Sequence, residues 1–224
     1  GVLLNARTTP SLTLRSENAV NLELESAGGA GARPSSSADG QMVVFEQPGP
    51  VTRIFLRNLL ASTIIELTTA FNGNAPNGSS FAPRISSDGR FVVFHSFASN
   101  LIANDNNEHA DIFRYDVFNQ KLLRISIDTN GNEANGGSFY PVPNADGSRV
   151  AFESHAGNLV PSSTYSGKEI FAWKKSFGLS KGTIELISNG NADSFDASIS
   201  GNGSRIAFTT FATDLVVGET DDNG

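Results

Sequence analysis

Short apolar runs alternate with turn residues along nearly the whole chain, and residues 82–126 show the pattern most fully. Within this stretch, runs at 83–86, 91–94, 111–116 and 121–126 are separated by turn residues or by a polar loop. Each run has the length of a β-strand, and β-branched and aromatic residues are frequent in the runs. The stretch therefore predicts a unit of four short strands.

The same unit recurs along the chain. Four turn dipeptides, each followed by an apolar run that ends in Phe, lie at 39–40, 88–89, 146–147 and 202–203, with spacings of 49, 58 and 56 residues. Asp-Gly and Asn-Gly favour tight hairpin turns because both central residues of a type I′ turn need positive φ. Four such signals in the same context indicate an internal repeat.

The two ends of the chain match two halves of one repeat. Residues 1–16 align without a gap to 111–126, so the chain begins with the last two strands of a unit. Residues 197–224 supply the first two strands of a unit. The segment 17–32 then takes the place of an inter-blade loop, with a flexible linker as the alternative.

These repeats predict an all-β fold, a β-propeller of four-stranded antiparallel blades. About four blades are expected in a single domain of residues 1–224, with one blade split between the N- and C-termini. The blade strands are placed in 1–16 with 197–224, in 33–68, in 82–126 and in 140–188. Half-blades that pair within one chain close the ring, whereas self-association through half-blades gives a swapped dimer or a polymer.

Two stretches of the second full repeat resemble a known family. Residues 83–94 read PRISSDGRFVVF and residues 111–116 read DIFRYD. Both are similar to the TolB-type, WD-like propeller repeat, whose blades carry Pro-x-x-Ser-x-Asp-Gly-x-x-Val/Ile-x-Phe and Asp-Ile-Phe-x-x-Asp. The resemblance covers nearly the whole chain and implies a bacterial propeller that is periplasmic, secreted or on the cell surface. Since that family usually has six to eight blades, this chain is either a complete ring or a segment of a longer one.

The composition narrows the range of partners. A net charge of −7 argues against nucleic acid or an anionic membrane surface as the main partner. No apolar run approaches the roughly 20 residues that a membrane helix needs. The chain contains no cysteine, so neither a disulfide nor a thiol site is expected. The single tryptophan, Trp173, matches Tyr115 in the repeat and is interpreted as packing between blades.

The long polar loops also repeat, and they gather on the face opposite the Asp-Gly turns. Asn and Gly are typical of loop architecture because they tolerate positive φ and form local hydrogen bonds. The alternative is that this loop-rich face binds a ligand. In that case the candidate residues are Asn74, Asn77, Asn132, Asn135 and Asn191.

A calcium site is the one cofactor site that the sequence suggests. Asp105, Asn107 and Asp111 lie close together in the loop between the second and third strands of one unit. Calcium needs six to eight oxygen ligands, so backbone carbonyls and water would have to complete the site. The alternative is that these residues form Asx turns and hydrogen bonds at the start of a strand.

No catalytic motif is present. His95, His109 and His155 fall on non-equivalent repeat positions, and the chain has no nucleophile elbow or phosphate-binding glycine loop. We therefore expect a non-enzymatic propeller that serves as a protein-interaction or structural module outside the cytoplasm. The alternative is the propeller domain of a carbohydrate-active enzyme or a peptidase, which should bind its ligand on the loop-rich face in a concave pocket with convergent carboxylates or histidines.

Overall fold

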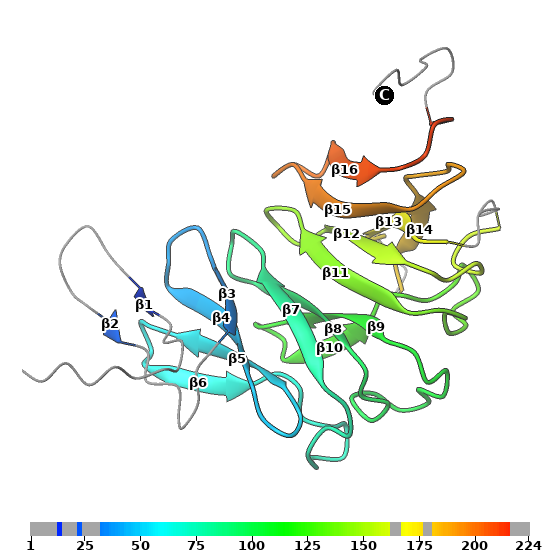
Figure 1. The fold of residues 1–224 in the computed structure, drawn as a ribbon. Helices are drawn as coiled ribbons and strands as arrows, with labels where there is room; N and C mark the ends of the chain where they lie inside the picture. The colour runs from blue at the N-terminus through cyan, green and yellow to red at the C-terminus, as the bar shows by residue number, and fades with distance from the viewer. Residues whose placement is uncertain (1–12, 15–21, 24–31, 162–166, 177–180, 216–224) are drawn as a thin grey trace, which may run out of the picture.

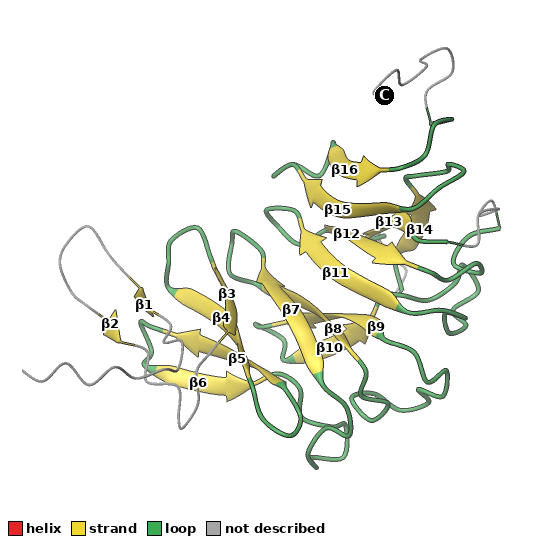
Figure 2. Ribbon diagram, in the orientation of Figure 1, coloured by secondary structure: helices red, strands yellow, loops and turns green. Residues whose placement is uncertain are grey.

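The computed structural model describes residues 13–14, 22–23, 32–161, 167–176 and 181–215. In these residues the chain forms strands and loops and no helix (Figure 2), so nothing in them has the length and apolar character of a membrane-spanning helix. The described strands form three four-stranded antiparallel sheets and two two-stranded ones. The predicted all-β fold is confirmed.

Each four-stranded sheet is one blade, and its strands are neighbours in chain order. The first blade consists of β3 (Ala32–Ser36), β4 (Met42–Gln47), β5 (Arg53–Asn58) and β6 (Thr63–Glu66). The second blade consists of β7 (Ser80–Ile85), β8 (Phe91–Ser96), β9 (Asp111–Asp116) and β10 (Lys121–Arg124). The third blade consists of β11 (Ser138–Pro143), β12 (Arg149–Ser154), β13 (Glu169–Lys174) and β14 (Thr183–Leu186). The fourth sheet holds β15 (Ser194–Ile199) and β16 (Ile206–Thr210).

The repeated turn dipeptides connect the first two strands of each blade and of the fourth sheet, as predicted. They are not type I′ turns, because in each dipeptide only the glycine has a positive φ. Their glycines, Gly40, Gly89, Gly147 and Gly203, have φ of +68°, +73°, +60° and +71°. In each turn the preceding Asp or Asn side chain accepts a 3.0 Å hydrogen bond from the backbone N–H two residues further on. The side chain thus fixes the turn from within, which is why Asp or Asn recurs at this position.

The core lies within and between the blades. In each four-stranded blade, a Phe on the second strand stacks on a Phe on the third, with ring centroids 6.0, 5.7 and 6.0 Å apart. Trp173 is 2% exposed and belongs to the apolar cluster that also contains Val93 and Ile112 of the second blade. The prediction that Trp173 packs between blades is therefore confirmed.

The blades are arranged as an open fan (Figure 1), in which β1 and β2 lie at one end and β15 and β16 at the other. Among the described strands, β16 pairs with β15 alone. The strand at 2–5, which the sequence predicts to complete that sheet, lies outside the described residues. The propeller architecture is confirmed, and in the described part of the chain it is open.

One local expectation is wrong. The segment 17–32 was expected to be a loop or a linker, but two of its residues form β2 (Leu22–Glu23). This strand pairs in antiparallel fashion with β1 (Thr13–Leu14), which the repeat alignment places in the outer strand of the split blade. A hairpin between near neighbours closes only a short loop, so it costs less chain entropy than pairing with a distant strand.

Candidate functional site

A pocket of about 460 Å³ lies among the innermost strands of the fan. Its lining comes from β3, β7, β11, β12 and β15, so every described blade and the fourth sheet contribute to it. The innermost strands pack side by side in chain order, β3 beside β7, β7 beside β11, and β11 beside β15. The sequence analysis set a concave pocket with convergent carboxylates or histidines as the sign of an enzyme, and two carboxylates, Glu153 and Asp196, line this axial pocket.

One residue of each innermost strand lines the axial pocket in a left-handed backbone conformation. These four bulge residues are Arg33, Ala82, Tyr140 and Asp196, with φ of 47°, 52°, 50° and 55°. At each of them the register of the strand pair shifts, as in a β-bulge. Non-glycine residues in this region are strained by about 1 kcal/mol or more, and such strain concentrates at functional sites. At equivalent backbone positions, the four innermost strands thus present a cation, a methyl group, a phenol and a carboxylate to the pocket.

Buried acceptors on the second strands hold two of the bulges in place. Glu46 Oε1 accepts a 2.7 Å hydrogen bond from the N–H of Ala82 in the next blade. Glu153 Oε1 accepts a 2.9 Å hydrogen bond from the N–H of Asp196 in the next sheet, and Lys168 Nζ lies 3.1 Å from Glu153 Oε2. Both carboxylates are at least 95% buried. The bulges are therefore part of the contacts between neighbouring sheets.

The second blade has a histidine at this repeat position. His95 is 4% exposed, and its ring lies 5.5 Å from the ring of Tyr140, the bulge residue of the next blade. Phe97 and Phe139 also pack against His95, at 6.2 and 5.4 Å. Burial, together with the charge of Arg33, lowers the pKa of His95 to about 4, so the ring is neutral at pH 7. Its Nδ1 has no hydrogen-bond partner among the described residues.

The charges that line the axial pocket are separated by sign. Arg33 and Arg84 belong to the first and second blades, whereas Glu153 and Asp196 belong to the third blade and the fourth sheet. Arg33 Nε lies 3.8 Å from Glu46 Oε1, and the Arg33 side chain is 63% exposed. The arrangement can form hydrogen bonds and ion pairs with groups of both signs at once.

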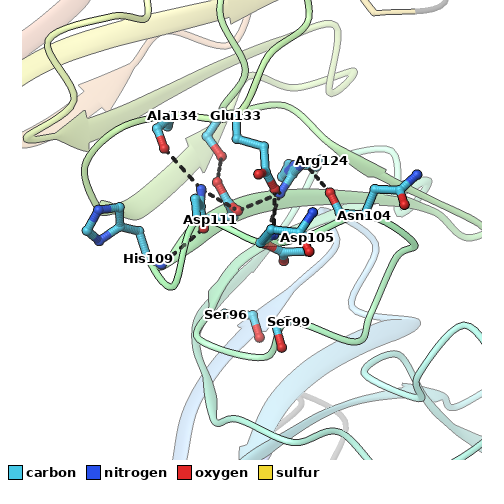
Figure 3. A network of polar contacts seen from close by, with 12 residues as sticks. Ser96, Ser99, Asn104, Asp105, His109, Asp111, Arg124, Glu133 and Ala134 are labelled. Carbon is cyan, nitrogen blue, oxygen red and sulfur yellow. Dashed lines mark hydrogen bonds and ion pairs between the residues drawn. The ribbon is translucent and has the colours of Figure 1, made fainter.

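A second polar cluster surrounds Arg124, the last residue of β10 (Figure 3). Arg124 Nη1 lies 3.0 Å from Asp105 Oδ1, 3.0 Å from Asp111 Oδ2 and 2.9 Å from Glu133 Oε1. Its Nη2 also donates to the carbonyl oxygen of Asn104 at 3.4 Å. This Arg124 network joins the loop after β8, the start of β9, the end of β10 and the loop before β11.

The pKa values in the Arg124 network are shifted by burial and by the closeness of the carboxylates to one another. Burial raises the pKa of Asp105 to about 6, and the neighbouring Asp111 carboxylate adds to this effect. Burial also raises the pKa of Asp111. Burial lowers the pKa of Arg124, but the Asp111 and Glu133 carboxylates outweigh it and raise the pKa overall. Three acidic groups thus share one guanidinium.

The structure brings Asp105 and Asp111 together at Arg124, and Asn107 Nδ2 donates to Asp111 Oδ2 at 3.4 Å. Asn107 donates from Nδ2 to the carbonyl oxygen of Ala134 at 3.1 Å and accepts from the N–H of His109 at 3.0 Å. In the described part of the chain, no group of three or more His, Cys, Asp or Glu side chains is arranged to hold a metal ion. The guanidinium supplies the positive charge that was assigned to calcium, and calcium binding stays a prediction.

The candidate asparagines of the loop-rich face connect loops to one another. The backbone N–H groups of Asn77, Asn135 and Asn191 each donate to a side-chain oxygen 23 residues further on, at 3.0, 3.0 and 2.8 Å. Asn74 and Asn132 donate their N–H groups to side chains of their own turns, at 3.1 and 2.7 Å. These are the contacts of loop architecture, and ligand contact by these residues stays a prediction.

Sequence reasoning did not find the bulge residues. The available signal was a proline five residues before the turn Asp, which recurs at Pro34, Pro83 and Pro141. Proline in a strand marks an edge or a bulge because it cannot donate to the ladder. That signal locates the bulge but does not reveal that the four residues meet at one pocket.

The fold resembles solved β-propellers. TolB from Acinetobacter baumannii matches with a TM-score of 0.50 and 19% identity, over 88% of this chain and 46% of that one. The tricorn protease matches with a TM-score of 0.50 and 16% identity, over 71% of this chain and 15% of that one. The β-propeller domain of the Trilobed protease from Pyrococcus furiosus matches with a TM-score of 0.43 and 16% identity, over 74% of this chain and 44% of that one.

Sequence comparison adds no match, because neither a family model nor a curated protein sequence matches the chain. The chain spans less than half the length of the TolB chain that it resembles. With identities below one fifth, the structural likeness concerns the fold. The repeated Asp-Gly hairpins, the four-stranded blades and the likeness to the TolB structure lead to one conclusion: the chain has the fold of a TolB-like β-propeller.

Proposed function

We propose that this chain is a non-enzymatic binding propeller that holds a segment of a protein partner in its axial pocket. The observation that carries the proposal is the set of bulge residues. Arg33, Ala82, Tyr140 and Asp196 share one strained backbone geometry but differ in chemistry. A polypeptide is the ligand class that offers acidic, basic, apolar and hydrogen-bonding groups within a few ångströms.

The mode of binding follows from the innermost strands. Each is an edge strand toward the axis, and such edges can accept an added strand. Proline at 34, 83 and 141, next to a bulge, removes an N–H and breaks the ladder at that point. The partner segment is therefore held by the side chains of the axial pocket instead of by strand addition.

We place this activity outside the cytoplasm. The support is the resemblance of residues 83–94 and 111–116 to an exported propeller family. Subcellular fractionation of the source cells, with detection of the full-length protein in each fraction, is the direct check. Recovery in the cytosolic fraction would contradict this placement.

A random-peptide phage library selected on the purified chain tests the proposed function. Selected peptides should lose about tenfold in affinity when Arg84→Gln or Asp196→Asn is introduced, since each substitution removes a charged hydrogen-bonding partner. Lys121→Gln and Glu185→Gln, on the outermost strands β10 and β14, are matched controls that should bind as the wild type does. Peptides that bind all five proteins equally would overturn the proposal.

A carbohydrate-active propeller is the second candidate, because two carboxylates, Glu153 and Asp196, line the same pocket. Paired carboxylates are the usual groups of glycoside hydrolysis. Assay of the purified chain against plant and bacterial polysaccharides, with Glu153→Gln as the control, distinguishes this candidate. Release of reducing ends by the wild type and not by the variant would favour the enzyme.

A further inference from the structure

Two charged side chains of the axial pocket, on β7 and β15, are not neutralised by another described residue. Arg84, which follows the bulge of β7, forms no ion pair or hydrogen bond through its side chain with another described residue. The Asp196 carboxylate, at the bulge of β15, is likewise without a side-chain partner in the described chain. Arg33 and Glu153, by contrast, already lie near Glu46 and Lys168. Arg84 and Asp196 are therefore the charges that a ligand has to match.

An aromatic group lies between these two charges in blade order. Tyr140 of β11, which is 48% exposed, lines the axial pocket between the contributions of β7 and β15. Phe97, which is 52% exposed, and Phe139 continue this aromatic surface, with ring centroids 6.1 Å apart. Strands β7, β11 and β15 follow one another along the fan (Figure 1), so their lining residues Arg84, Tyr140 and Asp196 present a cation, then an aromatic ring, then an anion.

A ligand with one charge leaves the opposite wall without a partner. Taking a charged group out of water without an ion pair or hydrogen bond is unfavourable, so such a ligand gains little from the second wall. An aromatic surface suits a proline or an aromatic side chain, because grooves lined by aromatic residues recognise extended proline-containing segments. Charge complementarity thus specifies the occupant more narrowly than pocket size does.

We infer that the axial pocket selects a peptide segment with an acidic and a basic side chain on either side of a prolyl or aromatic residue. The acidic group pairs with Arg84 and the basic group pairs with Asp196. This inference rests on the proposed function, because it names the chemistry of the partner segment for the same pocket.

The test uses four acetylated and amidated peptides and a double-mutant cycle. The parent is Asp-Ala-Pro-Ala-Lys, and in the others Asn replaces Asp, Gln replaces Lys, or both are replaced. Affinities are measured by NMR titration against the wild type, Arg84→Gln and Asp196→Asn. Asn tolerates left-handed backbone as Asp does, so Asp196→Asn preserves the bulge at φ 55°. Lys121→Gln and Glu185→Gln serve as controls on the outer strands.

We expect the parent to bind the wild type about tenfold more tightly than either singly neutral peptide. In Arg84→Gln, the Asp of the peptide should no longer increase affinity, whereas the Lys still should. In Asp196→Asn, the Lys should no longer increase affinity, whereas the Asp still should. Pocket-dependent binding with no preference for the two-charge peptide would overturn the inference and leave the proposed function standing. Peptide binding that none of the pocket substitutions affects would overturn both.

Discussion

Glu46 on β4 accepts a 2.7 Å hydrogen bond from the backbone N–H of Ala82, the bulge residue of the next blade. Ala82 has a φ of 52°, and its N–H is unavailable for the normal ladder because the register shifts there. A buried N–H without a partner costs about 1–3 kcal/mol. The Glu46 carboxylate therefore stabilises both the bulge and the contact between the first two blades.

Glu46→Ala should lower the free energy of unfolding by about 2 kcal/mol, because it leaves the Ala82 N–H buried and unpaired. Glu46→Gln retains an acceptor oxygen and should lose less than half of that. Urea unfolding followed by tryptophan fluorescence measures both, since Trp173 is the single tryptophan. Equal destabilisation by the two substitutions would show that Glu46 stabilises the protein through its negative charge and not through the hydrogen bond that its oxygen accepts from Ala82.

Arg124 should be among the residues whose loss destabilises the protein most. Arg124→Ala leaves three carboxylates clustered without their shared counter-ion, and breaking a buried ion pair on one side typically costs about 3–5 kcal/mol. Because Asp105 and Asp111 then take up protons more readily, the loss should be larger at pH 7 than at pH 5. Arg90→Ala removes an exposed pair with Asp116 and should cost less than about 1 kcal/mol. A pH-independent loss in Arg124→Ala would contradict the role of carboxylate repulsion.

Any calcium ion at the sequence-predicted site would have to compete with Arg124 for the same carboxylate oxygens. In the wild type the guanidinium lies among the Asp105, Asp111 and Glu133 carboxylates, so millimolar calcium should leave the melting temperature unchanged. Arg124→Gln frees these carboxylates and the nearby Asn104 carbonyl, and calcium should then restore part of the lost stability. Differential scanning fluorimetry with calcium and with EDTA measures both. A calcium-dependent rise in the wild type would support the calcium site suggested by the sequence.

The parts of the fold that depend on local chemistry could be predicted from the sequence. An Asp-Gly turn is decided by a few neighbouring residues, and Asp39 and Asp88 bond their own turns as such residues do. Strand positions followed from the repeated apolar runs. The buried position of Trp173 followed from its match to Tyr115 in the repeat.

The candidate site could not be predicted in the same way, because it is made by residues far apart in the chain. Arg33 and Asp196 line one pocket although more than 160 residues separate them. Arg124 looked like an ordinary residue at the end of a strand. Its role depends on Asp105 and Glu133, which come from two different loops. Asp105 and Asp111 were found from their spacing, whereas Glu133 and the counter-ion were missed because spacing carries no information about them.

His95 should make the protein less stable as the pH falls. Its pKa is about 4 in the folded chain and near 6.5 when unfolded, so between these values the unfolded state binds more protons. The stability that the neutral ring contributes is fully present above pH 6.5 and is lost as the pH falls toward 4, by about 2–3 kcal/mol in that window. His95→Phe keeps a ring among Phe97, Phe139 and Tyr140 but cannot take up a proton. Urea unfolding at several pH values should therefore show a shallower loss in the variant. If the wild type and His95→Phe lose the same stability between pH 6.5 and pH 4, the prediction is wrong. Groups other than His95 then cause the loss of stability at low pH.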